Sequence, residues 1–175
     1  MQLSCGDLTR LVAEMKAVAK GLQVRSLWRD GENRYGLYLV SEDESRVRVV
    51  MTISLDPETG RVTLCPAAPV DKKILKERQR DSSHVLNQLR KHLDGARLEK
   101  IEQVENERIV LIHFDARAED DLQEVTKPRL AIELTGRRTN IVLMNEHNII
   151  RVVHKHGRGQ GGRDLVTKEA YTIPA

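Results

Sequence analysis

The feature that most constrains this fold is a long series of short apolar runs separated by turn residues. Within each run, hydrophobic side chains alternate with polar ones or crowd together, a pattern typical of antiparallel β-strands. Strands with one apolar face need a second apolar layer to cover that face, so the series favours an antiparallel β-sandwich. We expect strands at 22–28, 34–40, 46–54, 61–65, 96–104, 107–115, 129–135, 139–144 and 149–154.

Two segments follow the helical period instead. Residues 7–20 place apolar side chains on one helical face, and Asp7 is a suitable N-cap for that helix. Residues 71–93 are also helical in pattern, and the serine pair at 82–83 can divide them into two helices. Two flanking helices beside runs of antiparallel strands predict an α+β fold. At 175 residues the chain is most simply one domain, residues 1–175.

The composition limits which partners such a domain can bind. The chain has 1 Trp, 3 Tyr and 1 Phe, too few for the aromatic platform on which many single-strand RNA binders stack bases. The formal net charge is +3, so any contact with RNA should rely on local basic patches, phosphates and shape.

The sequence also bears on the cellular compartment. No apolar run in it is long enough to span a bilayer, and no signal segment opens it. Cys5 and Cys65 fit neither a disulfide framework nor a zinc knuckle. Unpaired thiols are typical of reducing compartments, so we expect a cytoplasmic protein without a membrane partner.

Basic residues gather in three parts of the sequence. The first is the segment 72–80, the second is the pair 137–138 at an expected hairpin, and the third is the tail after residue 150. If these groups share one side of the molecule, they form a phosphate-binding surface. The alternative is a solvated helix face with scattered basic loops. The candidate phosphate contacts are Lys72, Lys73, Lys76, Arg137, Arg138, Arg158 and Arg163.

Patterns that would indicate catalysis or a bound cofactor are weak. The glycine-rich stretch 157–162 is not followed by the helix of a phosphate-binding loop, so a mobile basic loop is the favoured interpretation. His154 and His156 can share a strand face but lack a third ligand, so no metal site is expected. The sequence has no nucleophile elbow and no catalytic cysteine signature. We therefore expect neither a cofactor nor an enzymatic activity.

Three stretches of the sequence, taken in order, carry a recognisable pattern. They are the helix-to-strand segment 85–112, the hairpins of 131–153 with their Glu, Gly and Asn spacing, and the end 162–174 with Arg-x-Leu followed by Tyr-x-x-Pro. With residues 7–14, this set resembles the NFACT-N domain of the RqcH, NEMF and fibronectin-binding protein A-like family. The resemblance spans nearly the whole chain. It implies a fold similar to the N-domain of formamidopyrimidine-type DNA glycosylases.

The resemblance implies a role in ribosome-associated quality control. Full proteins of this family bind a stalled large ribosomal subunit that carries peptidyl-tRNA. They recruit tRNA and support untemplated C-terminal tailing of the nascent chain, with alanine in bacteria. Because the ribosome makes those peptide bonds, the protein itself is not expected to be an enzyme. The expected partners are tRNA and the large ribosomal subunit with its ribosomal RNA.

The resemblance also implies a tRNA-binding site. An acidic residue in the family's first helix matches Asp7, and an Asp-Arg pair at a strand start matches Glu107 and Arg108. Glutamate at 107 keeps the family's charge but is longer by one methylene. An arginine beside an acid is a suitable ligand for phosphate or a base because the carboxylate orients the guanidinium. The structural alternatives are a helix N-cap at Asp7 and an exposed ion pair at 107–108.

Two other functions are open at this point. The family's older name suggests a fibronectin-binding, adhesin-like module, which would require export from the cell. A glycosylase-like enzyme needs an N-terminal proline amine followed by glutamate, whereas the chain begins with Met1, Gln2 and Leu3, so base excision is disfavoured. The family's helix-hairpin-helix, coiled-coil and C-terminal domains cannot fit after Pro174, so we expect a fragment of a longer protein.

Overall fold

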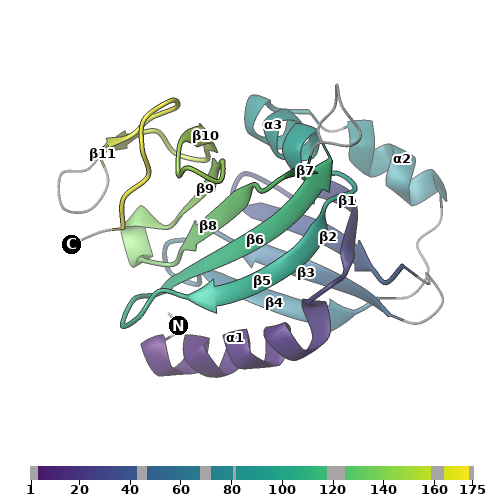
Figure 1. Cartoon of the computed structure of the whole chain (residues 1–175), viewed down its shortest axis with the longest axis horizontal. Helices are drawn as coiled ribbons and strands as arrows, with labels where there is room; N and C mark the ends of the chain where they lie inside the picture. Colours follow the sequence, from purple (N-terminus) through teal and green to yellow (C-terminus); the bar gives the residue numbers. More distant parts are fainter. Residues whose placement is uncertain are drawn as a thin grey trace.

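A computed structural model describes residues 4–42, 47–67, 72–80, 82–117, 125–158 and 164–173. Its helices and strands confirm the predicted α+β class (Figure 1). The helical elements are α1 (Cys5–Ala19), α2 (Lys72–Arg80), α3 (His84–Leu93) and the 3-10 turn η1 (Gly136–Arg138). The strands are β1 (Gln23–Arg29), β2 (Arg34–Val40), β3 (Arg48–Ser54), β4 (Arg61–Pro66), β5 (Arg97–Gln103), β6 (Ile109–Arg117), β7 (Val125–Thr126), β8 (Arg129–Glu133), β9 (Asn140–Met144), β10 (Ile150–Val153), β11 (Gly157–Arg158) and β12 (Asp164–Leu165).

Every predicted strand is present, with ends that shift by a few residues. The sequence reading missed β7, β11 and β12, because a strand of 2 residues is too short to display a period. Several predictions fall outside the described residues. These are Arg163 and most of the glycine-rich stretch.

The strands of the main sheet pair antiparallel in the order β10-β9-β8-β6-β5-β1-β2-β3-β4, and β7 pairs with β6. The two layers of the predicted β-sandwich therefore come from one continuous sheet. The halves join between β1 and β5, where Gln23 lies opposite Arg97. In Figure 1, β5, β6 and β8 cross in front of β2, β3 and β4. The sheet turns back on itself, so each half covers the apolar face of the other.

One hydrophobic core lies between the two halves of the sheet. Ile112 and Phe114 of β6 share it with Leu37 of β2 and Met51 of β3, and all four side chains are buried. The outer face of β8–β10 packs in a second cluster with the C-terminal segment around Tyr171. Because both faces of this half are covered, β8 and β9 are crowded with buried residues instead of alternating.

The residues behind the family resemblance fasten the C-terminal segment to the sheet. The Tyr171 hydroxyl donates a hydrogen bond of 2.6 Å to Glu133 Oε2, and Glu133 is 1% exposed. The Asn140 side chain donates to the Lys155 carbonyl at 2.9 Å and accepts from the Lys155 amide at 2.9 Å. These side chains satisfy buried polar groups that would otherwise be costly. Their spacing in the sequence therefore follows from the contacts that hold this fold together.

The first helix begins earlier than predicted. Ser4 is the N-cap: its hydroxyl accepts from the Asp7 amide at 3.1 Å, and the Asp7 carboxylate accepts from the Ser4 amide at 3.4 Å. Asp7 is thus the third residue of a capping box instead of the N-cap itself. Both residue types are good caps, and the apolar period, which starts at Leu8, does not distinguish them.

The predicted break between the second and third helices is confirmed. Ser83 caps α3 by accepting from the Leu86 amide at 3.1 Å, and the apolar side of α3 is buried. The α2 helix rests on β1 through Arg78, whose guanidinium carbon lies 3.8 Å from the centre of the Trp28 ring. Trp28 lies flat against Gly36, where an added Cβ would meet the indole at 2.3 Å. Only glycine at this position permits so close a contact.

Candidate nucleic-acid interface

Three parts of the chain that are distant in sequence meet at one end of the molecule. They are the N-terminal end of α1, the turn between β5 and β6, and the connection between β8 and β9 that contains η1 (Figure 1). The Cys5 thiol lies 3.8 Å from the carbonyl oxygen of Glu107. The amide of Leu134 donates to the carbonyl of Arg108 at 2.8 Å. We call this region the α1 end, and it contains the predicted Asp7, Glu107, Arg108, Arg137 and Arg138.

One side chain, which the sequence analysis missed, organises the α1 end. The Gln103 amide donates to the Glu107 carbonyl at 2.9 Å and to the Cys5 carbonyl at 3.3 Å. Its oxygen accepts from the Thr9 hydroxyl at 2.7 Å. An amide suits this position because it donates and accepts at once. A glutamine at the end of a strand gives no signal of this role in the sequence.

Glu107 and Arg108 lie in the turn before β6, which corrects their predicted place at a strand start. Asn106 adopts a left-handed backbone conformation with φ of 59°, which reverses the chain after β5. The Glu107 amide then donates to the Val104 carbonyl at 3.0 Å. Both side chains are partly buried, so the turn presents them from a fixed backbone.

Asp7 lies in the first turn of α1 with an exposed side chain. The Ser4 hydroxyl, which donates to the Asp7 carboxylate at 2.7 Å, is the main cause that lowers the pKa of this carboxyl below its ordinary value. Asp7 is therefore ionised at neutral pH and accepts hydrogen bonds. It serves the capping box and still faces solvent, so this capping role is compatible with the predicted binding role.

The basic residues at the α1 end and those on α2 do not form one surface. Arg137 and Arg138 are exposed on η1, next to the turn that holds Arg108. Lys72, Lys73 and Lys76 are exposed on α2, which lies at the opposite end of the view in Figure 1. The predicted phosphate contacts thus divide into two patches, one at the α1 end and one on α2. Arg158 lies on β11, and its side chain is outside the described residues.

Among the described residues, no group of three or more His, Cys, Asp or Glu side chains is placed to hold a metal ion. In the same part of the chain, no helix has the length and apolar character needed to cross a membrane. A shallow groove of about 470 Å³ runs beside the α1 end, between α1 and the turn after β5.

Comparison with known proteins identifies relatives of this chain. A family profile described as NFACT N-terminal and middle domains matches residues 6–175. The Rqc2 homolog RqcH of Streptococcus pneumoniae is 27% identical over 170 residues, which cover 95% of this chain and 29% of that protein. The archaeal Rqc2 homolog aRqcH of Methanocaldococcus jannaschii is 38% identical over 86 residues, covering 49% of this chain and 12% of that protein. The chain thus spans less than a third of these relatives' lengths.

Solved structures share the fold. The N-terminal domain of fibronectin-binding protein PavA from Streptococcus pneumoniae matches with a TM-score of 0.80 and 28% identity, over 96% of this chain and 60% of that chain. The N-terminal part of the fibronectin/fibrinogen-binding protein from Streptococcus suis matches with a TM-score of 0.81 and 23% identity, with the same coverage of 96% and 60%. Because the family profile covers nearly the whole chain, this chain belongs to the NFACT N-terminal family, and it is similar to proteins named RqcH.

Proposed function

We propose that this chain is the N-terminal RNA-binding module of an RqcH-like quality control factor. In this role it contacts tRNA and the stalled large ribosomal subunit with its peptidyl-tRNA, and it supports alanine tailing of the nascent chain. It acts in the cytoplasm without catalysing a reaction itself. The observation that carries the proposal is that the start of α1 and the turn after β5 lie together at the α1 end, where the Cys5 thiol contacts the Glu107 carbonyl and Gln103 donates to the carbonyls of Cys5 and Glu107.

The α1 end offers RNA two kinds of contact. Carboxylates at Asp7 and Glu107 accept hydrogen bonds from ribose hydroxyls or base amino groups, and Arg108 donates to phosphates or base edges. Arg137 and Arg138 add exposed positive charge on the neighbouring η1. A folded tRNA can be bound through such contacts without aromatic stacking, which suits a chain with 3% aromatic residues.

The first test measures binding of tRNA to the chain by fluorescence anisotropy. We expect the double variant Glu107→Ala/Arg108→Ala to bind at least about tenfold more weakly, because charge-assisted contacts to RNA are lost. The matched control is Lys20→Ala, an exposed cation at the other end of α1, which should bind tRNA as the unmodified chain does. Equal affinity of the double variant and the control would show that the assigned site is wrong.

The second test measures tailing. The chain replaces the matching residues of Streptococcus pneumoniae RqcH, and alanine tails are quantified on a stalled reporter protein. We expect the chimera to restore tails and the Glu107→Ala/Arg108→Ala chimera to lose them. Restored tails in both chimeras would contradict the role of these two residues while leaving the family function intact.

A second candidate function is binding of fibronectin. It is supported by the likeness to PavA, whose name describes it as a fibronectin-binding protein, at 28% identity and a TM-score of 0.80. Surface plasmon resonance with immobilised fibronectin distinguishes the two functions. Saturable binding to fibronectin, together with no detectable binding to tRNA, would replace the first proposal with the second.

We also expect the fold to be similar to the N-domain of formamidopyrimidine-type DNA glycosylases, without their chemistry. Borohydride trapping with duplex DNA that contains an oxidised base should therefore give no covalent adduct. A trapped adduct would overturn the non-enzymatic assignment.

A further inference from the structure

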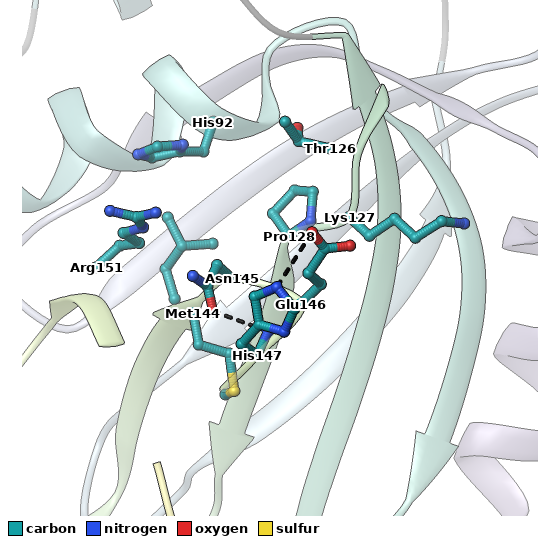
Figure 2. A pocket seen from close by; sticks show the side chains of 10 residues that line it. His92, Thr126, Lys127, Pro128, Met144, Asn145, Glu146, His147 and Arg151 are labelled. Carbon is teal, nitrogen blue, oxygen red and sulfur yellow. Dashed lines mark hydrogen bonds and ion pairs between the residues drawn. The ribbon is translucent and has the colours of Figure 1, made fainter. Parts of the chain in front are cut away.

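A second concave site lies away from the α1 end. It is a pocket of about 340 Å³ between the last turn of α3, the segment from β7 to β8 and the turn from β9 to β10 (Figure 2). Pro128, Leu143 and Met144 are buried residues that line it, so part of its wall is apolar. The remainder of the lining is rich in side chains that donate hydrogen bonds.

Arg151 and His92 approach the pocket from different elements. Figure 2 shows the Arg151 guanidinium, from β10, and the His92 imidazole, from α3, one above the other at the same side of the pocket. Arg151 is exposed, and its side chain makes no hydrogen bond or ion pair within the part of the chain that the structure describes. A cation held over a cavity without an acidic partner is available to a ligand.

The other charged groups of the pocket are engaged with one another or with the surrounding strands. Lys127 points away from the pocket in Figure 2, and its ammonium lies 3.2 Å from Asp115 and 3.7 Å from Glu99. Glu146 is the pocket's acidic residue, and its carboxylate lies 3.6 Å from His147 Nε2. Arg151 therefore decides the sign of the charge that the pocket attracts.

The Asn145 side chain shapes the base of this site. Its oxygen accepts from the amides of His147 and Ile149, each at 2.9 Å, which fixes the turn between β9 and β10. The turn keeps His147 at the rim of the pocket and carries the chain into β10, where Arg151 follows. The backbone positions from which His147 and Arg151 reach the pocket are therefore set before any ligand binds.

We propose that this pocket binds a phosphate group, with Arg151 as its main ligand and the imidazoles of His92 and His147 as further donors, His147 exchanging its contact with Glu146 for the phosphate. The guanidinium fork binds two oxygens of an anion at once. Donors that come from α3, from β10 and from the preceding turn suit a tetrahedral anion, whose oxygens point in several directions. A planar carboxylate would use fewer of them. The site is separate from the α1 end and does not depend on the proposed function.

The experiment is a titration of the isotopically labelled chain with inorganic phosphate, followed by NMR at constant ionic strength. We expect saturable shifts of the amides in 125–128 and 145–151, with a dissociation constant on the order of 1 mM. Arg151→Gln should raise that constant at least about tenfold, because the charge-assisted bonds are lost. Glu146→Gln should lower it because a nearby negative charge is removed. Lys20→Gln is the control and should leave it unchanged.

Two further arms identify the source of the phosphate. Adenosine monophosphate and a single-stranded RNA trinucleotide are each titrated against the phosphate-loaded chain. Competition by both supports a nucleic-acid phosphate, and competition by the mononucleotide alone supports a free phosphate compound. Shifts that do not saturate, that acetate reproduces at the same concentration, or that persist unchanged in Arg151→Gln would overturn the proposal.

Discussion

The two patches that hold the predicted RNA contacts are attached to the protein in different ways. At the α1 end, the helix buries Leu8, Val12, Met15 and Ala19, and Gln103 joins it to the turn after β5. On α2, no side chain among those described is fully buried. That helix is held in place through Arg78, whose guanidinium stacks on the Trp28 ring. The backbone carbonyl of Arg78 also accepts a hydrogen bond of 2.8 Å from the Arg90 guanidinium.

This difference separates two ways of binding RNA. Groups on a fixed backbone can recognise particular atoms of a partner, because their geometry is set in advance. A row of exposed lysines attracts phosphates without requiring a fixed geometry, and its contribution depends on salt. We therefore expect the α1 end to supply specificity and α2 to supply general affinity.

The largest expected effect comes from loosening α2. Gly36→Ala forces a methyl group against the Trp28 ring, which an added Cβ would meet at 2.3 Å. If the indole is displaced, Arg78 loses the ring on which its guanidinium stacks, and α2 loses that contact with β1. We expect the free energy of unfolding to fall by about 2–3 kcal/mol, the range seen when a packed core receives an extra methyl group. Denaturant unfolding measures the loss, and hydrogen exchange should show lower protection of α2 than of α1.

Gly6→Ala is the matched control in the other patch. An added Cβ at Gly6 meets no neighbour nearer than 4.0 Å, and the position lies in the first turn of α1. Alanine favours helix over glycine by up to about 1 kcal/mol, so this variant should be as stable as the unmodified chain or more so. If both variants are equally stable, the close contact between Trp28 and Gly36 does not anchor α2.

The next effect tests how the α1 end is fixed. Gln103→Leu removes the donor to the Cys5 and Glu107 carbonyls and the acceptor of the Thr9 hydroxyl. Loss of these bonds, two of which are partly buried, costs about 2 kcal/mol together, although the Thr9 hydroxyl keeps its bond of 2.9 Å to the Cys5 carbonyl. Because the turn also loses its link to α1, tRNA binding should weaken along with stability. Thermal unfolding and anisotropy report the two effects.

Gln23→Leu provides the comparison for that variant. The Gln23 amide donates a single exposed bond of 2.9 Å to the Gly95 carbonyl, at the junction of the two half-sheets. We expect a cost below about 1 kcal/mol and unchanged tRNA affinity. Equal losses of tRNA affinity in both glutamine variants would indicate a general loss of folded protein, not a local effect at the α1 end.

The strands and helices of this fold were predictable because their signals are local. Short apolar runs bounded by turn residues locate β2 and β3 without knowledge of the partner strand. The N-cap was misassigned because Ser4 and Asp7 are equally suitable residue types three positions apart. The turn at 104–108 was misread as a strand start, since the left-handed conformation of Asn106 is a property of one residue in context.

The residues of the candidate site could be predicted from the sequence, but their arrangement in space could not. Cys5 and Glu107 are separated by 102 positions, and their contact follows from how the folded sheet brings α1 to the turn after β5. Counting basic residues could not show that Arg78 lies over Trp28 while its neighbours on α2 face solvent. The number of charges in a segment does not reveal which of them pack against the protein.

A smaller effect is expected from the lysines of α2. Lys72→Gln/Lys73→Gln/Lys76→Gln should weaken tRNA binding by about tenfold at low salt and reduce the slope of log affinity against log salt by about 2–3. The loss should be similar for every tRNA species tested, because phosphate contacts carry no sequence information. The double variant Glu107→Ala/Arg108→Ala should instead weaken tRNA binding with only a small change in that slope, because it removes a single cation, Arg108. Identical salt slopes for the two variants would remove the distinction between the patches.

The smallest expected effect concerns the capping box. Ser4→Ala removes the acceptor for the Asp7 amide, and loss of a serine N-cap costs about 1 kcal/mol of stability at neutral pH. The same change should raise the pKa of the Asp7 carboxyl toward its ordinary value, since the Ser4 hydroxyl is the main cause that lowers it.

The pH dependence of this effect has a definite sign. A carboxyl whose pKa is lowered in the folded state adds stability above its unfolded pKa of 3.8, and that contribution is lost as the pH falls through the folded value. The unmodified chain and Ser4→Ala should therefore differ more in melting temperature at pH 7 than at pH values below 3.8. If the two melting temperatures approach each other in acid, part of the stabilisation that the capping box gives to α1 comes from the Asp7 charge. A difference that is constant with pH would assign all of it to the Ser4 hydroxyl as acceptor, leaving Asp7 free to bind RNA without cost to the helix.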